Sequence, residues 1–181
     1  MSDTRIRIAA GLERAFAEHG FAAPSVGDLR DAAGVSLRTL YKYTPSREEM
    51  VYAALEHRHQ RYLEKVFGDL PEAGDRALAE IFHRIGAWMG TESARGCLFH
   101  AAVAAAPQDK RLIALLQEHK GEVARLAAKA GGLEGREVEL MLILEGLTQT
   151  WPLHGTHAID SANRMSTALR QAPLPSTVSA A

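Results

Sequence analysis

The sequence predicts an all-α protein of about nine helices. Apolar residues recur every three or four positions along several stretches, as in Leu112, Leu115 and Leu116. The seven prolines lie at helix-sized intervals, and proline is expected to separate helices because it lacks a backbone N–H. Runs that alternate apolar and polar residues, as half-buried strands do, are missing. We therefore expect helices throughout, without an internal repeat.

The composition excludes several classes of protein. The chain has 181 residues, 46% of them hydrophobic and 24% charged, which is typical of one folded domain or two small ones rather than of a disordered chain. A net charge of -1 excludes a global basic field, so any nucleic-acid site has to be a local cluster. The single cysteine, Cys97, excludes an intrachain disulfide, and the N-terminus lacks a signal-peptide pattern. These two features favour a cytoplasmic protein. We expect no membrane partner, since the longest nearly uninterrupted apolar run, 97–107, is too short to cross a bilayer.

The helices at the N-terminal end are defined by their caps. Ser25, with Asp28 three residues later, begins a short helix that Gly34 ends. Ser36 begins another, and Ser46 with Glu49 has the spacing of a further capping box. The helices expected in this part span 3–20, 26–33, 37–43 and 47–67, with Phe21 folding back onto the first of them. Further helices are expected near 75–89, 97–106, 109–130, 134–151 and 157–171.

The two short helices joined at Gly34-Val35 have the spacing of a helix-turn-helix. No acidic residue occurs from Ala32 to Arg47, whereas Arg38, Lys42 and Arg47 make this stretch cationic. Arginine can pair with a guanine edge, threonine can contact a thymine methyl, and lysine and tyrosine can bind phosphates. The alternative interpretation is an ordinary helical corner with a solvated basic face.

A longer pattern resembles the DNA-binding signature of the TetR family of transcriptional regulators. It reads Ser25-x3-Leu29-x2-Ala32-Ala33-Gly34-Val35-Ser36-x2-Thr39-Leu40-Tyr41-x-Tyr43-x-Pro45-Ser46-Arg47-Glu48-Glu49-Met50, and the resemblance covers residues 5–55. It implies a DNA-binding domain over 1–48 and a ligand-binding and dimerisation domain over 49–171, followed by a tail, 172–181, that we expect to be disordered. The residues expected to contact DNA are Ser25, Ser36, Leu37, Arg38, Thr39, Tyr41, Lys42, Tyr43 and Arg47.

The sequence departs from the family pattern at several positions. In the second helix, Leu29-Arg30 stands where an alanine or an isoleucine-alanine pair is typical, and Gly27 weakens that helix. Thr44 stands where the family usually has a phenylalanine that fills the small N-terminal core, and Arg47 stands where it has lysine. We expect Thr44 to leave that core less filled and Arg47 to keep the positive charge.

Beyond residue 67 the resemblance is reduced to Arg95-Gly96-Cys97-Leu98-Phe99, similar to a Gly-Cys segment of many such regulators. It implies that the helices near 134–151 and 157–171 form a dimer interface, with an intrachain core as the alternative.

A pocket that has aromatic walls and a few polar groups suits a small-molecule effector. The candidate pocket residues are Phe82, Trp88, Cys97, His100, Met141, Glu145 and Trp151. Glu145 is the most informative, because a carboxylate on an apolar helix face needs a partner.

The favoured function is a homodimeric TetR-type repressor that binds a pseudo-palindromic operator in double-stranded DNA and is released by an effector, with no cofactor and no enzymatic activity. A regulator without an effector is one alternative. Another is a metal enzyme, because carboxylate-bridged di-metal sites use two Glu-x-x-His pairs, such as Glu56-x2-His59 and Glu80-x2-His83, plus a glutamate from each of two other helices. The pairs Cys97-x2-His100 and His154-x2-His157 have too few partners for a zinc site of about four ligands.

Overall fold

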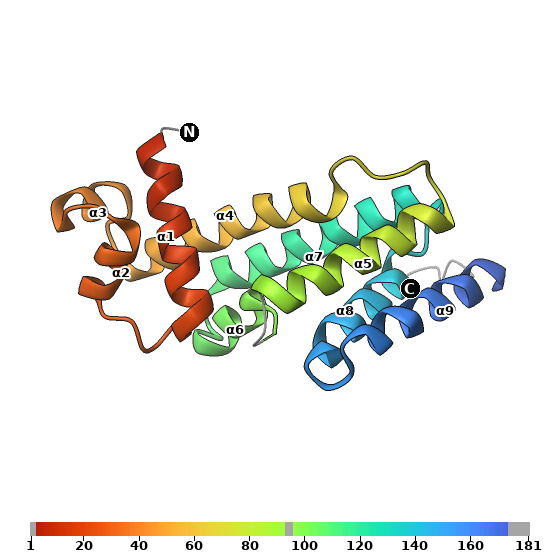
Figure 1. Cartoon of the computed structure of the whole chain (residues 1–181). Helices are drawn as coiled ribbons and strands as arrows, with labels where there is room; N and C mark the ends of the chain where they lie inside the picture. Colours follow the sequence, from red (N-terminus) through yellow and green to blue (C-terminus); the bar gives the residue numbers. More distant parts are fainter. Residues whose placement is uncertain (1–2, 93–95, 174–181) are drawn as a thin grey trace, which may run out of the picture. The chain divides into compact units, whose positions relative to one another are not determined.

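A computed structural model describes residues 3–92 and 96–173 (Figure 1). Every regular element in this part of the chain is an α-helix, which confirms the predicted fold class. The helices are α1 (Asp3–His19), α2 (Val26–Ala33), α3 (Leu37–Tyr43), α4 (Arg47–Phe67), α5 (Asp75–Glu92), α6 (Leu98–Ala105), α7 (Lys110–Gly131), α8 (Glu137–His154) and α9 (Thr156–Gln171).

The predicted helix bounds agree with these within three residues, but two local predictions were wrong. Pro152 lies inside α8 rather than after it, in the last turn, where few further backbone bonds depend on its missing N–H. At the start of α4, Glu49 donates its backbone N–H to the Ser46 hydroxyl as expected. Its carboxylate does not complete the predicted capping box and instead accepts a bond from Arg111.

The chain forms two compact units. The first unit comprises Met1–Glu64 and Arg95–His119, and the second comprises Lys65–Ala94 and Lys120–Ala181. The predicted functional boundary between residues 48 and 49 stays a prediction. The expected disorder of the tail concerns residues that, from 174 onward, lie outside the described part of the chain.

The core of the first unit joins α1 to the three helices that follow it. Fully buried side chains from each helix meet there: Ile8, Leu12, Phe16, Leu29, Leu40, Met50 and Leu55. Phe21 folds back as predicted, and its ring stacks on that of Phe16 with 5.0 Å between centroids.

α1 and α2 cross in close contact at Gly11. A Cβ atom at this position would lie 2.3 Å from the carbonyl oxygen of Ala32 and 2.5 Å from the Cα of Ala33. Both neighbours are backbone atoms, which cannot move aside as a flexible side chain would. The close contact between these helices therefore requires glycine.

We predict that Gly11→Ala lowers the free energy of unfolding by about 1–3 kcal/mol, the range expected when a well-packed core is overfilled. The gain in helix propensity from alanine, about 1 kcal/mol, is too small to offset a clash with two backbone atoms. Urea denaturation measures the change. Gly121→Ala on α7 is the control, since its Cβ would meet no atom within 4 Å, and an equal stability for the two variants would contradict the prediction.

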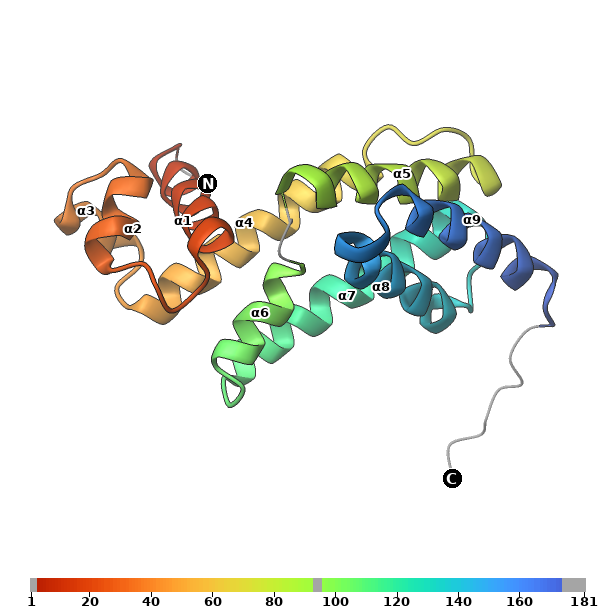
Figure 2. The same ribbon diagram turned by 60° about the horizontal axis from the view of Figure 1, so that its bottom comes forward.

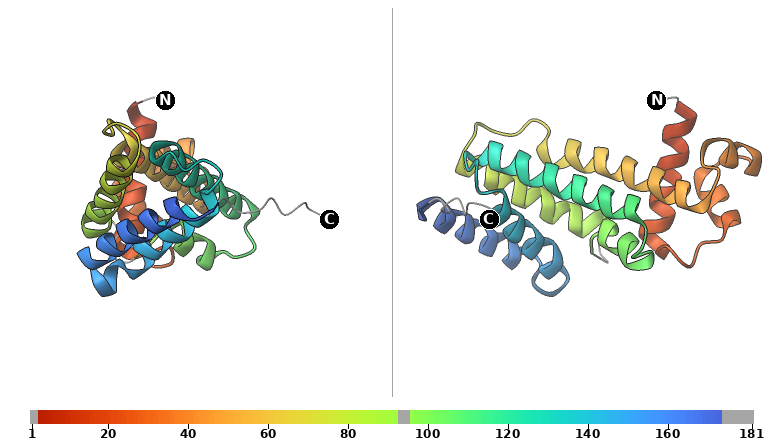
Figure 3. Two further views of the ribbon diagram at one scale, coloured as in Figure 1. Left: turned by 90° about the vertical axis from the view of Figure 1, so that its right-hand side faces the viewer. Right: turned by 180° about the vertical axis from the view of Figure 1, so that it is seen from behind.

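The second unit packs α5 against α8 and α9, and α8 and α9 run antiparallel side by side (Figure 3). Phe82 is fully buried on α5, and Gly86 leaves the space that Trp151 and Ile159 occupy. In the part of the chain that the structure describes, no helix is both long and apolar enough to span a membrane.

α8 and α9 also carry large apolar side chains that are exposed in the single chain. Leu142 is 68% exposed and Met165 is 54% exposed, and both line a groove of about 380 Å³ between the two helices. Other residues of the same two helices are used inside the unit: Thr148 is buried, and Ile159 packs at Gly86. Only part of the surface of the two helices that the family resemblance assigns to a dimer interface is therefore exposed and apolar.

Candidate nucleic-acid interface and ligand cavity

A short turn joins α2 to α3 (Figure 2). Two caps and one glycine build this turn. Ser25 and Asp28 form the predicted capping box, so α2 begins at a fixed residue. Gly34 ends α2 with φ 63° and ψ 38°, a left-handed conformation that glycine adopts without strain. The Ser36 hydroxyl then accepts a hydrogen bond from the backbone N–H of Thr39 and begins α3.

α3 buries one side and exposes the other. Leu40 is fully buried and anchors the helix to the core of the first unit. The exposed side chains are Leu37, Arg38, Tyr41 and Lys42, whose spacing places them on a continuous face of the helix. Because two of these four are cations and none is acidic, this surface suits an anionic partner.

The serines and the threonine predicted to contact DNA have roles within the fold. The Ser25 hydroxyl is bonded to Asp28, which lowers the pKa of that carboxyl. The hydroxyls of Ser36 and Thr39 are 2.8 Å apart and bonded to each other, and Thr39 is half-buried. Their side chains position α3, and any contact they make with DNA stays a prediction.

Two of the residues that depart from the family pattern, Thr44 and Arg47, also make contacts inside the first unit. Arg47 donates to the carbonyl oxygen of Phe21 at 2.7 Å, and its guanidinium lies 5.9 Å from the centroid of the Phe16 ring. Thr44 is buried, and its hydroxyl donates to the carbonyl oxygen of Leu40 at 2.9 Å. The hydroxyl of Thr44 thus has a partner in the small core.

A buried ionic cluster connects α1 to α4, and sequence reasoning missed it. Glu13 is only 2% exposed, and its carboxylate contacts His57 at 2.6 Å, Arg58 at 3.1 Å and Arg61 at 2.7 Å. Arg58 is itself buried. The sequence does indicate that the Glu13 carboxylate is buried, because Glu13 lies in the same helical register as Ala9 and Phe16, which face the core.

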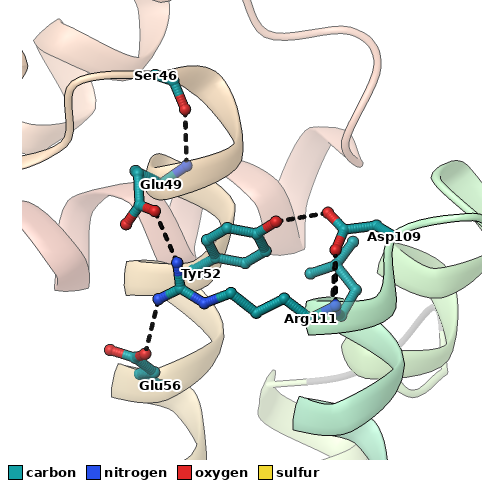
Figure 4. A network of polar contacts seen from close by, with 7 residues as sticks. Ser46, Glu49, Tyr52, Glu56, Asp109 and Arg111 are labelled. Carbon is teal, nitrogen blue, oxygen red and sulfur yellow. Dashed lines mark hydrogen bonds and ion pairs between the residues drawn. The ribbon is translucent and has the colours of Figure 1, made fainter.

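A second polar network connects α4 to the start of α7 (Figure 4). The Tyr52 hydroxyl donates to Asp109 at 2.6 Å, which raises the pKa of Tyr52 to about 12 and lowers the pKa of Asp109. The Arg111 guanidinium lies 3.9 Å from the centroid of the Tyr52 ring and contacts Glu49 at 2.6 Å and Glu56 at 3.5 Å. Four charged side chains and one hydroxyl thus fix the start of α7 against α4.

The network predicts a pH dependence of stability. The lowered pKa of Asp109 contributes stability that is present above its unfolded value, near 3.9, and is lost as pH falls. The raised pKa of Tyr52 contributes stability that is present below about pH 10 and is lost towards pH 12. We therefore expect Tyr52→Phe to reduce the melting temperature most near neutral pH and to approach the parent protein at pH 3. Melting curves between pH 3 and 8 measure it, and a constant difference across that range would contradict the prediction.

The seven predicted pocket residues are divided between the two units. Phe82, Trp88, Met141, Glu145 and Trp151 belong to the second unit, where Phe82 and Trp88 are core residues. Cys97 and His100 belong to the first unit.

The polar members of the predicted pocket set are Glu145, Cys97 and His100, and each has a different environment. Glu145 is ion-paired with Lys120 of α7, and this is the partner that its position on an apolar helix required. Cys97 is half-buried at the N-cap of α6, and His100 is exposed. Whether any of them contacts a ligand stays a prediction.

A cavity of about 470 Å³ lies in the first unit and is lined from α1, α4, α6 and α7. Its lining side chains include Arg5, Ala53, His59, Phe99, Leu115 and His119, and none of the seven predicted residues. Sequence reasoning missed it because its walls come from four helices that are distant in the sequence. His119 is the residue that could have indicated this cavity from the sequence, since it shares the apolar register of Leu112, Leu115 and Leu116. It is buried in the structure.

The metal-enzyme alternative finds no support in the described residues. The two Glu-x-x-His pairs fall in different compact units. Glu80 is bonded to Arg84 at 2.6 Å, and His59 is bonded to His119. Among residues 3–92 and 96–173, no group of three or more histidine, cysteine or acidic side chains is arranged to hold a metal ion.

Comparison with known proteins agrees with the geometry of α1 to α4. The family model described as bacterial regulatory proteins, tetR family, matches residues 8–54. This segment is a TetR-family domain. It includes all of α2 and α3, so the helix-turn-helix described above lies within the TetR-family domain.

The whole chain has the fold of TetR-family regulators. SCO4454, a TetR-family transcriptional regulator from Streptomyces coelicolor, matches with a TM-score of 0.72 and 20% identity over 93% of this chain and 95% of its own. The reduced form of NemR from E. coli matches with a TM-score of 0.70 and 19% identity, over 96% and 100%. The multidrug binding protein EbrR, complexed with imidazole, matches with a TM-score of 0.65 and 21% identity, over 98% and 99%. Among curated proteins, none matches significantly.

Proposed function

We propose that the protein is a transcriptional regulator that binds operator DNA through α3. The observation that carries this proposal is the exposed, acid-free face of α3, with Arg38, Tyr41 and Lys42, inside a TetR-family domain. Side chains of these types match the groups of a major groove: Arg38 can pair with a guanine edge, and Lys42 can bind a phosphate.

We infer that two copies bind a pseudo-palindromic site. The exposed apolar residues Leu142 and Met165 on α8 and α9 supply a face that a second copy would cover, and a dimer places two copies of α3 on two half-sites. Repression and release by a small-molecule effector are part of the same proposal. The matching fold of EbrR, a multidrug binding protein, supports the effector.

Selection of bound sequences from random duplex DNA tests the proposal. A symmetric motif with half-sites separated by about one helical turn, or by a multiple of it, is the expected result. The absence of any enriched sequence would overturn DNA recognition, and a single unrepeated half-site would overturn binding as a dimer.

Two substitutions on α3 separate phosphate contact from base contact. Lys42→Ala should weaken binding to all sequences and reduce the slope of log K against log salt by about one for each copy that binds. Arg38→Ala should relax the selected motif at one position of each half-site and cost about 1–3 kcal/mol on the preferred sequence. Titrations over a salt series and repeated selection measure both effects. An unchanged motif for Arg38→Ala would remove this residue from base recognition.

A further inference from the structure

The groove between α8 and α9 ends at a turn that carries two histidines. α8 ends at His154 and α9 begins at Thr156, so only Gly155 separates the two helices. Gly155 has φ 50°, a conformation that glycine adopts without strain, and its N–H donates to the carbonyl oxygen of Trp151 at 2.9 Å. This turn brings His154 and His157 to the same groove, and both residues line it.

Neither of these imidazoles is used to hold the single chain together. His154 and His157 are exposed, and neither forms a hydrogen bond or an ion pair in the described part of the chain. His57 of the first unit is different, since it contacts the carboxylate of Glu13 at 2.6 Å. His154 and His157 can therefore gain or lose a proton without breaking a contact of the single chain.

The groove itself contains no charged group that would stabilise a protonated imidazole. Its largest side chains are those of Leu142 and Met165, and its other polar members are the hydroxyl-bearing residues Thr150 and Ser161. No lysine, arginine or carboxylate is among the described residues that line it. A positive charge enclosed in this groove would lose its hydration without gaining a counter-charge.

The charged side chains of α9 that lie closest in sequence to the groove residues do not change this conclusion. Asp160 follows His157 by one turn but is exposed and does not line the groove. Arg164 donates to the hydroxyl of Ser161 at 3.0 Å, and a cation at this point opposes further positive charge.

The carboxylates of the helices packed alongside already have cationic partners. Glu145 of α8 is ion-paired with Lys120 of α7. On α5, which packs against both α8 and α9, Glu80 is ion-paired with Arg84 at 2.6 Å. Neither carboxylate lines the groove.

A second copy of this chain fits the groove in polarity. Outside α1 and α3, the large apolar side chains described as exposed all lie on α8 and α9: Val138, Leu142, Leu153 and Met165. A two-fold axis places identical surfaces against each other, so an uncharged apolar surface meets its own equivalent without a charge mismatch.

We propose that two copies pair through this groove with His154 and His157 neutral, and that protonation of these histidines separates the copies. The inference rests on the dimer of the proposed function and adds a means of control to it. The dimer binds fewer protons than two separate chains do, because the separate chains leave the imidazoles in water. Association is therefore favoured above about pH 6.5, where histidine is ordinarily neutral, and is lost as pH falls below it.

Sedimentation velocity at about pH 8 and about pH 5.5 measures the dissociation constant of the dimer. EDTA in both buffers prevents metal ions from bridging the histidines. A ring that must release its proton to enter the dimer weakens association by up to about tenfold at one pH unit below 6.5, and each copy brings two such rings. We expect the dissociation constant to rise about 100-fold or more at the lower pH. An equal dissociation constant at both pH values would overturn the inference and leave the proposed dimer in place, whereas a monomer at both would overturn both.

The double variant His154→Gln/His157→Gln assigns the response to these two residues. Glutamine is polar and does not titrate, so the dissociation constant of this variant should change less than about threefold over the same range. It keeps every other histidine, including His83, and His83→Gln at its exposed position on α5 should respond as the parent protein does. An equal response of the double variant and the parent protein would overturn the assignment.

A fixed positive charge tests the same mechanism without a change of pH. His157→Arg is charged at every pH used, and it should weaken the dimer about tenfold or more at about pH 8. An unchanged dissociation constant for this variant would contradict the exclusion of positive charge from the groove.

Operator binding distinguishes the inference from the proposed function. Operator affinity should fall from about pH 8 to about pH 5.5 in the parent protein and fall less in the double variant, since only the dimer binds both half-sites at high effective concentration. Equal losses in the two proteins would overturn the control of DNA binding by these histidines. A protein whose dimer responds to pH but that selects no DNA sequence would instead overturn the proposed function and leave the inference in place.

Discussion

Glu13→Gln should lower the free energy of unfolding of the first unit by about 3–5 kcal/mol, the range expected when a buried ion pair loses one partner. The carboxylate of Glu13 contacts His57, Arg58 and Arg61, and Arg58 is only 4% exposed. Glutamine has nearly the same shape, so packing is retained while the buried guanidinium of Arg58 loses the charge of this carboxylate. A loss of this size is a large fraction of the stability of an ordinary domain. Urea denaturation followed by circular dichroism measures it.

The matched control is Glu18→Gln on the same helix. Glu18 is exposed, and its contact with His19 spans 3.8 Å, so its removal should cost less than about 0.5 kcal/mol. If the two variants have the same stability, the Glu13 cluster does not hold α1 to α4.

Leu142→Glu should convert the proposed dimer into a folded monomer and reduce operator affinity by about 10²–10⁴-fold, because the second half-site is no longer bound at high effective concentration. Leu142 lies at the groove between α8 and α9 and is 68% exposed in the single chain. A carboxylate there would be buried without a partner in an apolar interface but would be solvated in a monomer. Sedimentation velocity and operator titration measure the two effects.

Ala87→Glu, at an exposed position of α5, introduces the same charge away from that groove and should leave both properties unchanged. A parent protein that is monomeric at micromolar concentration would contradict the dimer. A Leu142→Glu protein that remains dimeric would place the interface elsewhere.

The helices could be predicted from the sequence because their signals are local. The caps at Ser25 and Ser36 and the glycine at position 34 act within one or two turns, and α3 and α4 have the predicted bounds. The helix-turn-helix could also be predicted, because the spacing of its two helices and its cluster of positive charges lie within a stretch of about 20 residues.

The pocket prediction depended on contacts between distant helices, which no local pattern specifies. Trp88 was selected for its chemistry, yet it is a core residue of the second unit. The cavity of the first unit is lined by His59, Phe99 and His119, which are separated by 40 and 20 positions in the sequence. The ion pairs of Glu13 and Glu145 could not be predicted either, because a helical register shows that a carboxylate faces the interior but not which cation meets it.

The hydrogen bond that Arg47 makes inside the first unit affects how the protein would search for its operator on DNA. Of the three cations between residues 32 and 47, Arg47 is bonded to the carbonyl oxygen of Phe21, which leaves Arg38 and Lys42 exposed on α3. Fewer exposed cations mean that fewer condensed counterions are released on arbitrary sequences, and non-specific affinity falls with each. Such a protein would make short sliding excursions along DNA and return often to bulk solution. Its occupancy of a genome would then depend mainly on the paired base contacts of its operator.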